Sequence, residues 1–411
     1  MCSKSLIIIQ LLLFIPFGLC GQDRYRETLF TDDFSIRPNE EGSLRLSIDN
    51  TSFLKNNEFD GDIQKGYTLP GFRFSPRLVY TPISFVRLEA GLTLLRYWGT
   101  DKYPQSVYQR IPDWKTERYQ YGFHLRPFFR AQIQPHNNLS IVFGNVFGGA
   151  NHKLIDPLYD AELNYTADPE LGAQMIYNSK IAHVDAWVDW KRFIFKNDTH
   201  NETVTVGISS CLHLLNPQQQ GFYMGIPVQV LLTHQGGELD IVQDTIFSVA
   251  NGSAGLRFGF NFGESVVESL QLDVMGLGAN LFFSDKDAFP FTKGWAFYSG
   301  LKVKFKYLQA NMNFWRSGNF VNIMGNPVFG NLSTTIEGRT FPRTMVLNPG
   351  LKYEQTFDKA YHLGIDAEIF YNPRLYAYYR NSDPIQITKS FSWSTGLYLR
   401  INPSIILKKS K

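Results

Sequence analysis

The sequence is poor in cysteine. Only three of its 411 residues are cysteine, and two of them, Cys2 and Cys20, lie in an amino-terminal stretch that has the character of an export signal. Cys211 alone remains in the rest of the chain, which excludes an internal disulfide framework. Small exported domains commonly depend on disulfides, whereas a closed sheet is held together by its own strand pairing. An exported chain with a single thiol therefore favours a closed sheet.

Other absences exclude further classes of protein. Beyond the amino terminus no apolar run approaches the roughly 20 residues of a transmembrane helix, and no stretch repeats with a helical period, which counts against α/β enzyme folds. The 40 basic residues are balanced by 37 acidic ones, and the net charge of +3 is too small to indicate a nucleic-acid partner. The GxSxG, Walker A and HExxH motifs do not occur. We therefore predict no enzymatic activity, no cofactor and no metal site.

The amino terminus holds the one long apolar stretch. Lys4 precedes an apolar run over residues 6–17, and small residues follow it. A basic start, a short apolar core and small residues at the end are typical of a cleaved signal peptide. We therefore expect residues 1–21 to be removed on export. A short amino-terminal periplasmic segment is expected over residues 22–42.

Alternation of apolar and polar residues is the strongest pattern that is present. In WAFYSGLKVKFK (295–306) the aromatic and aliphatic residues share one parity, and the three lysines share the other. RYQYGFHLRPFFRAQI (118–133) has the same alternation over its whole length. Because a β-strand sends successive side chains to opposite faces, each stretch has an apolar face and a polar face.

Such segments recur along the chain, centred near residues 47, 76, 90, 125, 143, 174, 188, 208, 229, 256, 273, 300, 312, 349, 365 and 396. Their connections alternate between tight turns, such as 134–138 and 261–265, and longer polar links, such as 55–70 and 97–116. Outer-membrane barrels have short periplasmic turns and long extracellular loops. We therefore predict an all-β fold: a single closed antiparallel transmembrane β-barrel over 43–408, with about 16 strands and a range of roughly 14 to 18.

In such a barrel the apolar face contacts lipid. Aromatic residues at the segment ends are then expected to form girdles at the lipid headgroups: Trp98, Tyr119, Trp190, Trp295, Tyr307, Trp315 and Tyr371. The opposite face lines a lumen wide enough for water. The predicted pore-lining residues are basic: Arg73, Arg77, Arg87, Arg126, Arg130, Arg257, Lys302, Lys304, Lys306, Lys352 and Arg400.

Rings of basic residues favour anions through the field that they focus in a pore. We therefore hypothesise a weak preference for anions or acidic solutes. The alternative that the sequence leaves open is that these charges pair with acidic residues across strands and merely solvate the wall.

The connection 317–343 is unusually long for a surface loop without a function, since connections of this size are usually functional or disordered. Its apolar clusters argue against disorder. We expect it to fold into or over the lumen as a constriction that includes Phe320, Met324 and Phe329. A conventional external loop is the alternative.

Several polar groups invite a catalytic interpretation. His183 shares one face of a strand with two aspartates, but no converging ligands accompany it. Ser209 and His213 share a parity, but no acid or oxyanion donor follows them. HQGGELD (234–240) places a histidine, two glycines and two acids at a strand end. We interpret the first group as solvated lumen wall and the last as the mouth of a loop.

Over nearly the whole mature chain the sequence resembles the porin-like outer-membrane barrels of Gram-negative bacteria. Gln22, directly after the cleavage zone, and the phrases PELGAQMIY (169–177) and DAWVDW (185–190) are similar to uncharacterised barrels of the Bacteroidetes. The resemblance implies the barrel topology and an outer-membrane location. It also implies membrane lipid, lipopolysaccharide and the barrel-assembly machinery as partners.

These patterns together predict a porin-like channel for passive diffusion of small hydrophilic solutes, with a preference for anions. Two alternatives stay open: a plugged barrel that transports hydrophobic solutes, and a surface barrel that binds a partner through its loops. A plug would need an amino-terminal hatch, for which residues 22–42 are short. The oligomeric state is left open.

Overall fold

The computed structural model describes residues 29–60, 62–98, 123–194, 200–237, 246–263, 265–284, 289–336, 338–358, 360–373, 375–379, 384–387 and 391–409. The expected signal peptide and Tyr119 lie outside these residues. None of the helices in the described residues combines the length and the hydrophobicity that crossing a bilayer requires.

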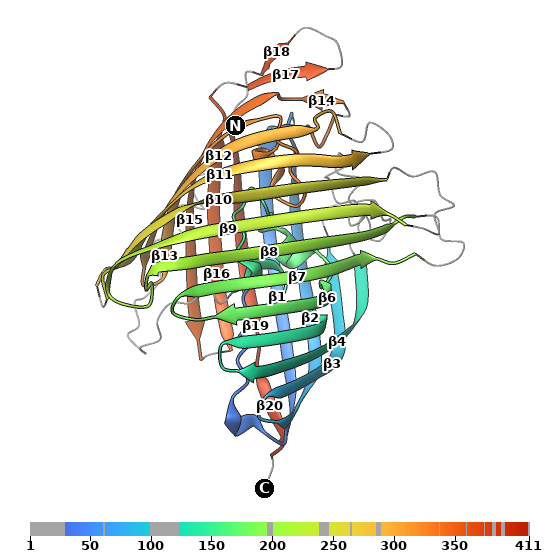
Figure 1. Cartoon of the computed structure of the whole chain (residues 1–411), viewed down its shortest axis with the longest axis vertical. Helices are drawn as coiled ribbons and strands as arrows, with labels where there is room; N and C mark the ends of the chain where they lie inside the picture. The colour runs from blue at the N-terminus through green and yellow to red at the C-terminus, as the bar shows by residue number, and fades with distance from the viewer. Residues whose placement is uncertain are drawn as a thin grey trace, which may run out of the picture.

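Sixteen strands in the described part of the chain form a closed antiparallel barrel (Figure 1). They are β1 (Ser43–Asp60), β2 (Lys65–Ile83), β3 (Val86–Tyr97), β4 (Phe123–His136), β5 (Leu139–Asn145), β6 (Leu171–Asn178), β7 (Ala182–Arg192), β8 (Glu202–Leu215), β9 (Gly221–Gly236), β10 (Phe247–Asn261), β11 (Val267–Ser284), β12 (Lys293–Phe305), β13 (Leu308–Gly318), β15 (Arg343–Phe357), β16 (Tyr361–Tyr371) and β19 (Phe391–Ile401). The sixteen predicted segments correspond one to one to these strands, so the predicted fold is confirmed.

Closure depends on β1, which pairs with β2 on one side and with the end of the chain on the other. Phe53 lies opposite Tyr398 in β19, and Ser47 lies opposite Ser404 in the short strand β20 (Ser404–Lys408). Pro403, which separates β19 from β20, has no N–H to donate and interrupts the strand. The carboxyl-terminal residues therefore complete the wall along the first part of β1.

The connections alternate in length, as predicted. One end of the barrel has tight turns, such as 306–307 between β12 and β13, and the other has long connections, such as 146–170 and 319–342. We call these the turn end and the loop end. In outer-membrane barrels the turn end lies in the periplasm and the loop end lies outside.

One predicted loop is wrong. β1 and β2 extend through most of 55–70, and only 61–64 connect them. Asn57 lies opposite Ser394 of β19 and Tyr67 of β2. The two strands are therefore longer than their alternating segments. Backbone pairing with neighbouring strands does not require apolar side chains, so the additional residues show no alternation.

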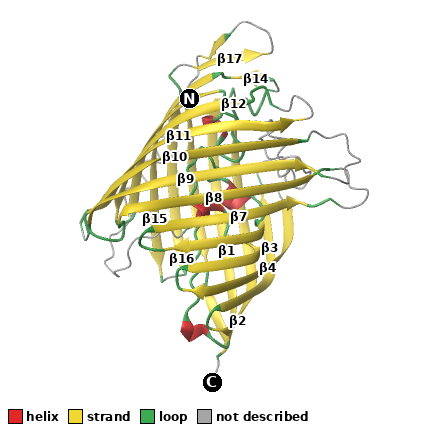
Figure 2. Cartoon of the chain, viewed as in Figure 1, coloured by secondary structure: helices red, strands yellow, loops and turns green. Residues whose placement is uncertain are grey.

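The remaining elements are short: η1 (Pro38–Glu40), η2 (Gly149–His152), α4 (Leu163–Thr166), η3 (Pro327–Phe329), β14 (Arg339–Thr340), β17 (Leu375–Tyr379) and β18 (Ile385–Ile387). Strands β14, β17 and β18 form a small separate sheet beyond the loop end (Figure 1). The helical turns η2 and α4 lie inside the outline of the barrel, behind β7 and β8 (Figure 2). The lumen is therefore occupied by parts of the chain itself.

The outer face of the barrel is apolar on every side. Large exposed side chains on it include Leu92, Phe129, Phe143, Met175, Ile208, Val230, Leu301, Met312, Leu351 and Leu397. In β12, Trp295 and Leu301 are exposed on this face, whereas Lys302 lines the lumen. This distribution of side chains matches the apolar band of a transmembrane barrel, which has lipid outside and polar groups inside.

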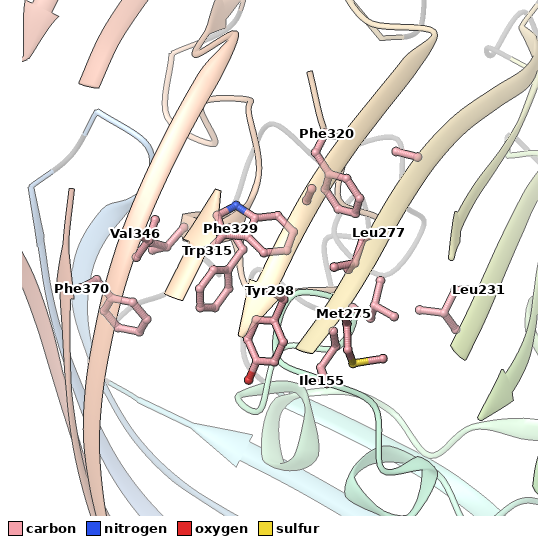
Figure 3. Close-up of a cluster of buried hydrophobic side chains, with 14 of the residues drawn as sticks. Ile155, Leu231, Met275, Leu277, Tyr298, Trp315, Phe320, Phe329, Val346 and Phe370 are labelled. Carbon is pink, nitrogen blue, oxygen red and sulfur yellow. The ribbon is translucent and has the colours of Figure 1, made fainter. Parts of the chain in front are cut away.

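The predicted girdle position of Trp315 is wrong. Trp315 is fully buried and points into the lumen, where it packs edge-on against Phe320 and Phe329 at ring-centre distances of 5.3 and 5.6 Å (Figure 3). An aromatic residue at a strand end marks the lipid face only where the opposite face is wet. Here the loop-end half of the lumen has a hydrophobic core of its own.

A charge on the outer face tests the assignment of the two faces. Leu351 lies near the middle of β15 and is 52% exposed. We expect Leu351→Arg to lower the free energy of unfolding from lipid vesicles by about 2–4 kcal/mol, the cost of an arginine near the bilayer midplane. Urea titration of the refolded barrel measures it. The control Leu351→Met should cost about 1 kcal/mol or less, and equal effects of the two variants would contradict the assignment.

Candidate functional site in the occupied lumen

Three stretches of the chain lie inside the barrel. The amino-terminal strap (29–37) enters from the turn end, and the first inner loop (146–170) and the second inner loop (319–336) enter from the loop end. The strap is part of the segment 22–42, for which the sequence predicts a short periplasmic segment. Its inward course follows from charged and polar groups of the wall that bind its backbone.

Arg400 of β19 is the main anchor of the strap. Its guanidinium donates to the backbone oxygens of Leu29 (3.2 Å) and Thr31 (2.9 Å). It also forms ion pairs with Asp32 of the strap (2.7 Å) and Asp49 of β1 (2.9 Å), and its side chain is only 6% exposed. A buried cation is tolerated only where carboxylates and hydrogen bonds compensate for its lost hydration. The strap therefore supplies part of the charge that Arg400 requires.

Two more wall residues bind the backbone of the strap. Gln132 of β4 donates to the carbonyl of Phe34 (2.5 Å), and Arg87 of β3 donates to the carbonyl of Ser35 (2.6 Å). Both wall side chains are buried. The strap thus gains from side chains the hydrogen bonds that a strand would gain from a neighbouring strand.

His152 anchors the first inner loop. The ring is buried, with Nδ1 2.8 Å from Asp185 of β7 and Nε2 2.9 Å from Glu170, and it stacks on Trp187 at 3.5 Å. Burial alone would lower the pKa of His152. The two carboxylates have the larger effect, and together they raise the pKa to about 9. At neutral pH the ring is therefore an imidazolium that donates from both nitrogens. It has no free nitrogen to act as a base, so this cluster is an anchor.

The two inner loops bind each other in the middle of the lumen. The backbone N–H of Asp160 in the first loop donates to the carbonyl of Met324 in the second (2.8 Å). At Gly325 a Cβ atom would lie 2.0 Å from the carbonyl oxygen of Pro157. Only glycine permits this approach, so the two loops form one internal body.

The residues predicted to form a constriction lie in this body. Phe320, Met324 and Phe329 are 0%, 8% and 1% exposed. They pack against the inner wall and the first inner loop, and Phe320 and Phe329 belong to the cluster drawn in Figure 3. That they restrict the path of a solute stays a prediction.

Most of the basic residues that were predicted to line the pore are paired. The partners are the Asn164 carbonyl for Arg73, Asp49 and Glu89 for Arg77, Glu40 for Arg87, Asp168 for Arg126, Glu89 for Arg130, Asp273 for Arg257, and Asp32 and Asp49 for Arg400. Lys306 lies in the turn after β12, with its ammonium 5.1 Å from the centre of the Tyr307 ring. Pairing cancels most of the field that a row of cations would project into the lumen.

Among the described residues, a large cavity extends through the lumen from the turn end, at Lys304 and Tyr353, to the loop end of β1 and β2, at Phe59 and Gln64. We call it the vestibule. It has a volume of about 800 Å³ and is bounded by the strap, by both inner loops and by the wall from β9 to β1. Lys302, Lys304 and Lys352 are among its lining residues. A smaller cavity of about 100 Å³ lies between the strap, the first inner loop and the wall from β1 to β4.

The groups that invited a catalytic interpretation do not come together. His183 Nδ1 is bonded to Asn178, whereas Asp185 is committed to His152. His213 faces the carbonyl of Lys180 and no serine. Among the described residues, no group of three or more histidine, cysteine, aspartate or glutamate side chains could hold a metal ion.

A different histidine–serine pair lies on the outer face near the loop end. His234 of β9 and Ser248 of β10 are directly opposite in the register, and His234 Nδ1 lies 2.8 Å from Ser248 Oγ. Next to it, Trp190 of β7 donates to Glu202 of β8, the strand that pairs with β9, at 2.8 Å. The sequence stretch beginning at His234 gave no sign of this pair, because the serine is on another strand and only the register brings it close.

Removing the anchor of the strap should release it. Arg400→Met removes the cation of Asp32 and leaves Asp49 only its 3.6 Å contact with Arg77. Since both carboxylates are largely shielded from water, we expect the free energy of unfolding to fall by up to about 3–5 kcal/mol. We also expect chymotrypsin to cut the strap at Phe30 and Phe34 faster than in the unchanged protein. Urea titration and mass spectrometry of the fragments measure the two effects.

Arg37 offers a matched control for this experiment. It pairs with Asp33 at 2.8 Å, but the side chains are 63% and 44% exposed. An exposed pair of this kind contributes less than about 1 kcal/mol, so Arg37→Met should leave both stability and cleavage nearly unchanged. Protection of the strap in Arg400→Met would show that Arg400 is not its anchor.

Comparisons with known proteins place the chain in a family. No curated protein matches it. Solved structures with a similar overall barrel include the outer membrane protein OprD from Pseudomonas aeruginosa (8% identity, TM-score 0.46, covering 92% of this chain and 98% of that one) and OccAB4 from Acinetobacter baumannii (10%, 0.45, 90% and 100%). The family model described as lipid A 3'-O-deacylase-type matches residues 36–410. The chain therefore belongs to the lipid A 3'-O-deacylase-type family.

Proposed function

We propose that this protein is an outer-membrane channel for small hydrophilic solutes, with a lumen restricted by its own strap and inner loops. The observation that carries the proposal is the vestibule of about 800 Å³, with polar and charged lining, inside a closed barrel of sixteen strands. A barrel of this size has room for an aqueous path. The apolar outer band and the sorting of connections by length support placement in the outer membrane.

The attachment of the inner loops allows a path to open without loss of the barrel. The loops are held by side-chain hydrogen bonds and apolar packing, each hydrogen bond contributing about 0.5–1.5 kcal/mol. The wall is held by continuous ladders between strands. A movement of the loops therefore costs far less than a break in the wall, so we assign the restriction of passage to the loops.

Selection in this channel would depend on size and polarity more than on a preference for anions, since the arginines of the wall are largely paired. Residues 1–21 would act as a signal peptide that directs the chain to the membrane. The barrel-assembly machinery and lipopolysaccharide would then be its partners there. The mass of the mature chain, measured by mass spectrometry, locates the cleavage site.

Shortening the second inner loop tests the channel. Gly318 and Arg343 lie opposite each other at the ends of β13 and β15, so a short glycine–serine linker can replace residues 320–335. We expect the single-channel conductance of the refolded protein in planar bilayers to rise severalfold, because the second of the two loops that fill the loop-end half is removed.

A second shortened connection serves as the control. Tyr371 and Phe391 lie opposite each other at the ends of β16 and β19, so residues 375–387, which hold the outer strands β17 and β18, can be replaced in the same way. This deletion leaves the lumen filled, and conductance should stay unchanged. Equal conductance of the two deletions and the unchanged protein would refute the proposed channel.

A second candidate function, hydrolysis of an ester in a membrane lipid, is favoured by the outward pair of His234 and Ser248. A serine hydroxyl that donates to a histidine nitrogen is the arrangement of a nucleophile and its general base. The pair lies on the face that contacts the outer leaflet, and the family name points to lipid A as a substrate. In the part of the chain that the structure describes, no carboxylate bonds to the other ring nitrogen, so the pair lacks an orienting acid there.

Lipid A deacylation can be measured directly. If the pair is catalytic, incubation of the refolded protein with purified lipid A should release an acyl chain, and Ser248→Ala and His234→Ala should each slow the release by about a hundredfold or more. Ser210 is the matched control: it lies on β8 and donates to the Val228 carbonyl, so Ser210→Ala should have no effect. Lipid A that keeps all its acyl chains with the unchanged protein would refute this candidate.

A further inference from the structure

The top of the vestibule, where it meets the inner loops, combines aromatic rings with carboxylates. Phe59 of β1, Phe329 of the second inner loop and Phe370 of β16 line it, with ring centres 5.9 Å apart for Phe59 and Phe370 and 6.3 Å apart for Phe329 and Phe370. Asp156 of the first inner loop and Glu368 of β16 line the same space. We call the surface formed by these five residues the vestibule roof.

The two carboxylates of the roof differ from the other acidic residues nearby. Asp366 is paired with Lys55 at 2.9 Å. In contrast, the carboxylates of Asp156 and Glu368 form no hydrogen bond and no ion pair with any residue that the structure describes. They are close enough for the charge of Asp156 to act on Glu368. A partner of opposite charge from outside the chain would therefore relieve their mutual repulsion.

The surroundings of the roof are negative overall. Its neighbours Asp160, Glu162 and Asp366 also line the vestibule, whereas Lys55 and Lys352 are the cations whose charges act on Glu368. The pKa of Asp160 is raised to about 7, mainly by burial and to a smaller extent by the negative charge of Glu162. The vestibule as a whole is lined by eight carboxylates and six cationic side chains, so with Asp160 protonated seven negative charges face six positive ones and the carboxylates keep a small excess that favours a cation.

The rings decide what kind of cation fits. A small metal ion needs several converging oxygen ligands at short distance, whereas aromatic faces attract ammonium and alkylammonium groups and offer apolar contact to their carbon atoms. Phe59 is partly exposed and is backed by the buried rings of Phe329 and Phe370, which are 1% and 4% exposed. This apolar wall beside two carboxylates matches both parts of an organic cation. Charge pairs with the carboxylates, and the alkyl surface packs against the rings.

We propose that the vestibule roof is a binding site for organic ammonium cations. This proposal identifies a class of solute for the proposed channel, and to that extent it rests on the proposed function. It also reverses the preference expected from the sequence, because the cations of the wall are largely paired and the unpaired charges of the roof are negative. Solutes with a protonated amine and an apolar body are the class that this site recognises.

Tetramethylammonium chloride is the probe for this site. Titration calorimetry of the refolded full chain in detergent micelles should show saturable binding, whereas tert-butanol, an uncharged molecule of similar shape, should not bind. Asp156→Asn and Glu368→Gln should each weaken the binding by about tenfold, the effect of losing one charge contact in a partly enclosed site. The two variants lie on different elements, and unchanged heat-modifiable migration on gels confirms that each barrel is folded.

Glu354→Gln is the matched control, because Glu354 lines the same vestibule on β15 but does not belong to the roof. It should bind the probe like the unchanged protein. Absence of saturable binding, or equal binding by the unchanged protein, Asp156→Asn and Glu368→Gln, overturns the site. The titration needs no ion flow, so a barrel that binds but does not conduct refutes the channel alone, and one that conducts but does not bind refutes the site alone.

Discussion

Pairing of backbone polar groups inside the barrel is the constraint on which the rest of the structure depends. A chain that enters the lumen carries N–H and C=O groups away from water, and each must find a partner. Wall carboxamides provide it: Gln229 accepts from Ile155 N–H (3.2 Å) and donates to the Lys153 carbonyl (3.0 Å). Asn251 does the same for the second inner loop, with Ile323 N–H (3.0 Å) and the Val321 carbonyl (2.8 Å). One side chain thus replaces a neighbouring strand over two residues.

The same constraint governs the charges. A lumen open to water could leave its arginines solvated and available to solutes. Once the strap and the loops fill it, a charge that stays inside requires an opposite charge, as Arg400 requires Asp32 and Asp49. A wall rich in basic residues therefore does not by itself make the lumen cationic, because most of the arginines are paired. Charges that keep no partner among the described residues, such as those of Asp156 and Glu368, are then the ones from which we infer a site for a solute.

The barrel therefore offers two faces on which a function can reside. The lumen, with its vestibule and its inner loops, is the face of the proposed passage of solutes. The outer face, with His234 beside Ser248, is the face on which the second proposed function would take place. The two do not compete for residues, because His234 and Ser248 lie on the outward parity of strands whose inward residues contact the inner loops.

The sequence by itself determined the wall: the number of strands, their antiparallel order and the inward or outward direction of residues such as Leu301 and Lys302. It could do so because a transmembrane strand repeats every two residues and every strand meets the same lipid. What fills the lumen was decided only by tertiary structure. The inner loops show no periodic pattern of apolar residues. Trp315 packs against Phe329 inside the lumen and not against lipid. The pairs Arg400–Asp32 and His234–Ser248 join residues that only barrel closure and strand register bring together. Local alternation records which solvent a side chain meets, and it carries no information about which distant residue lies opposite.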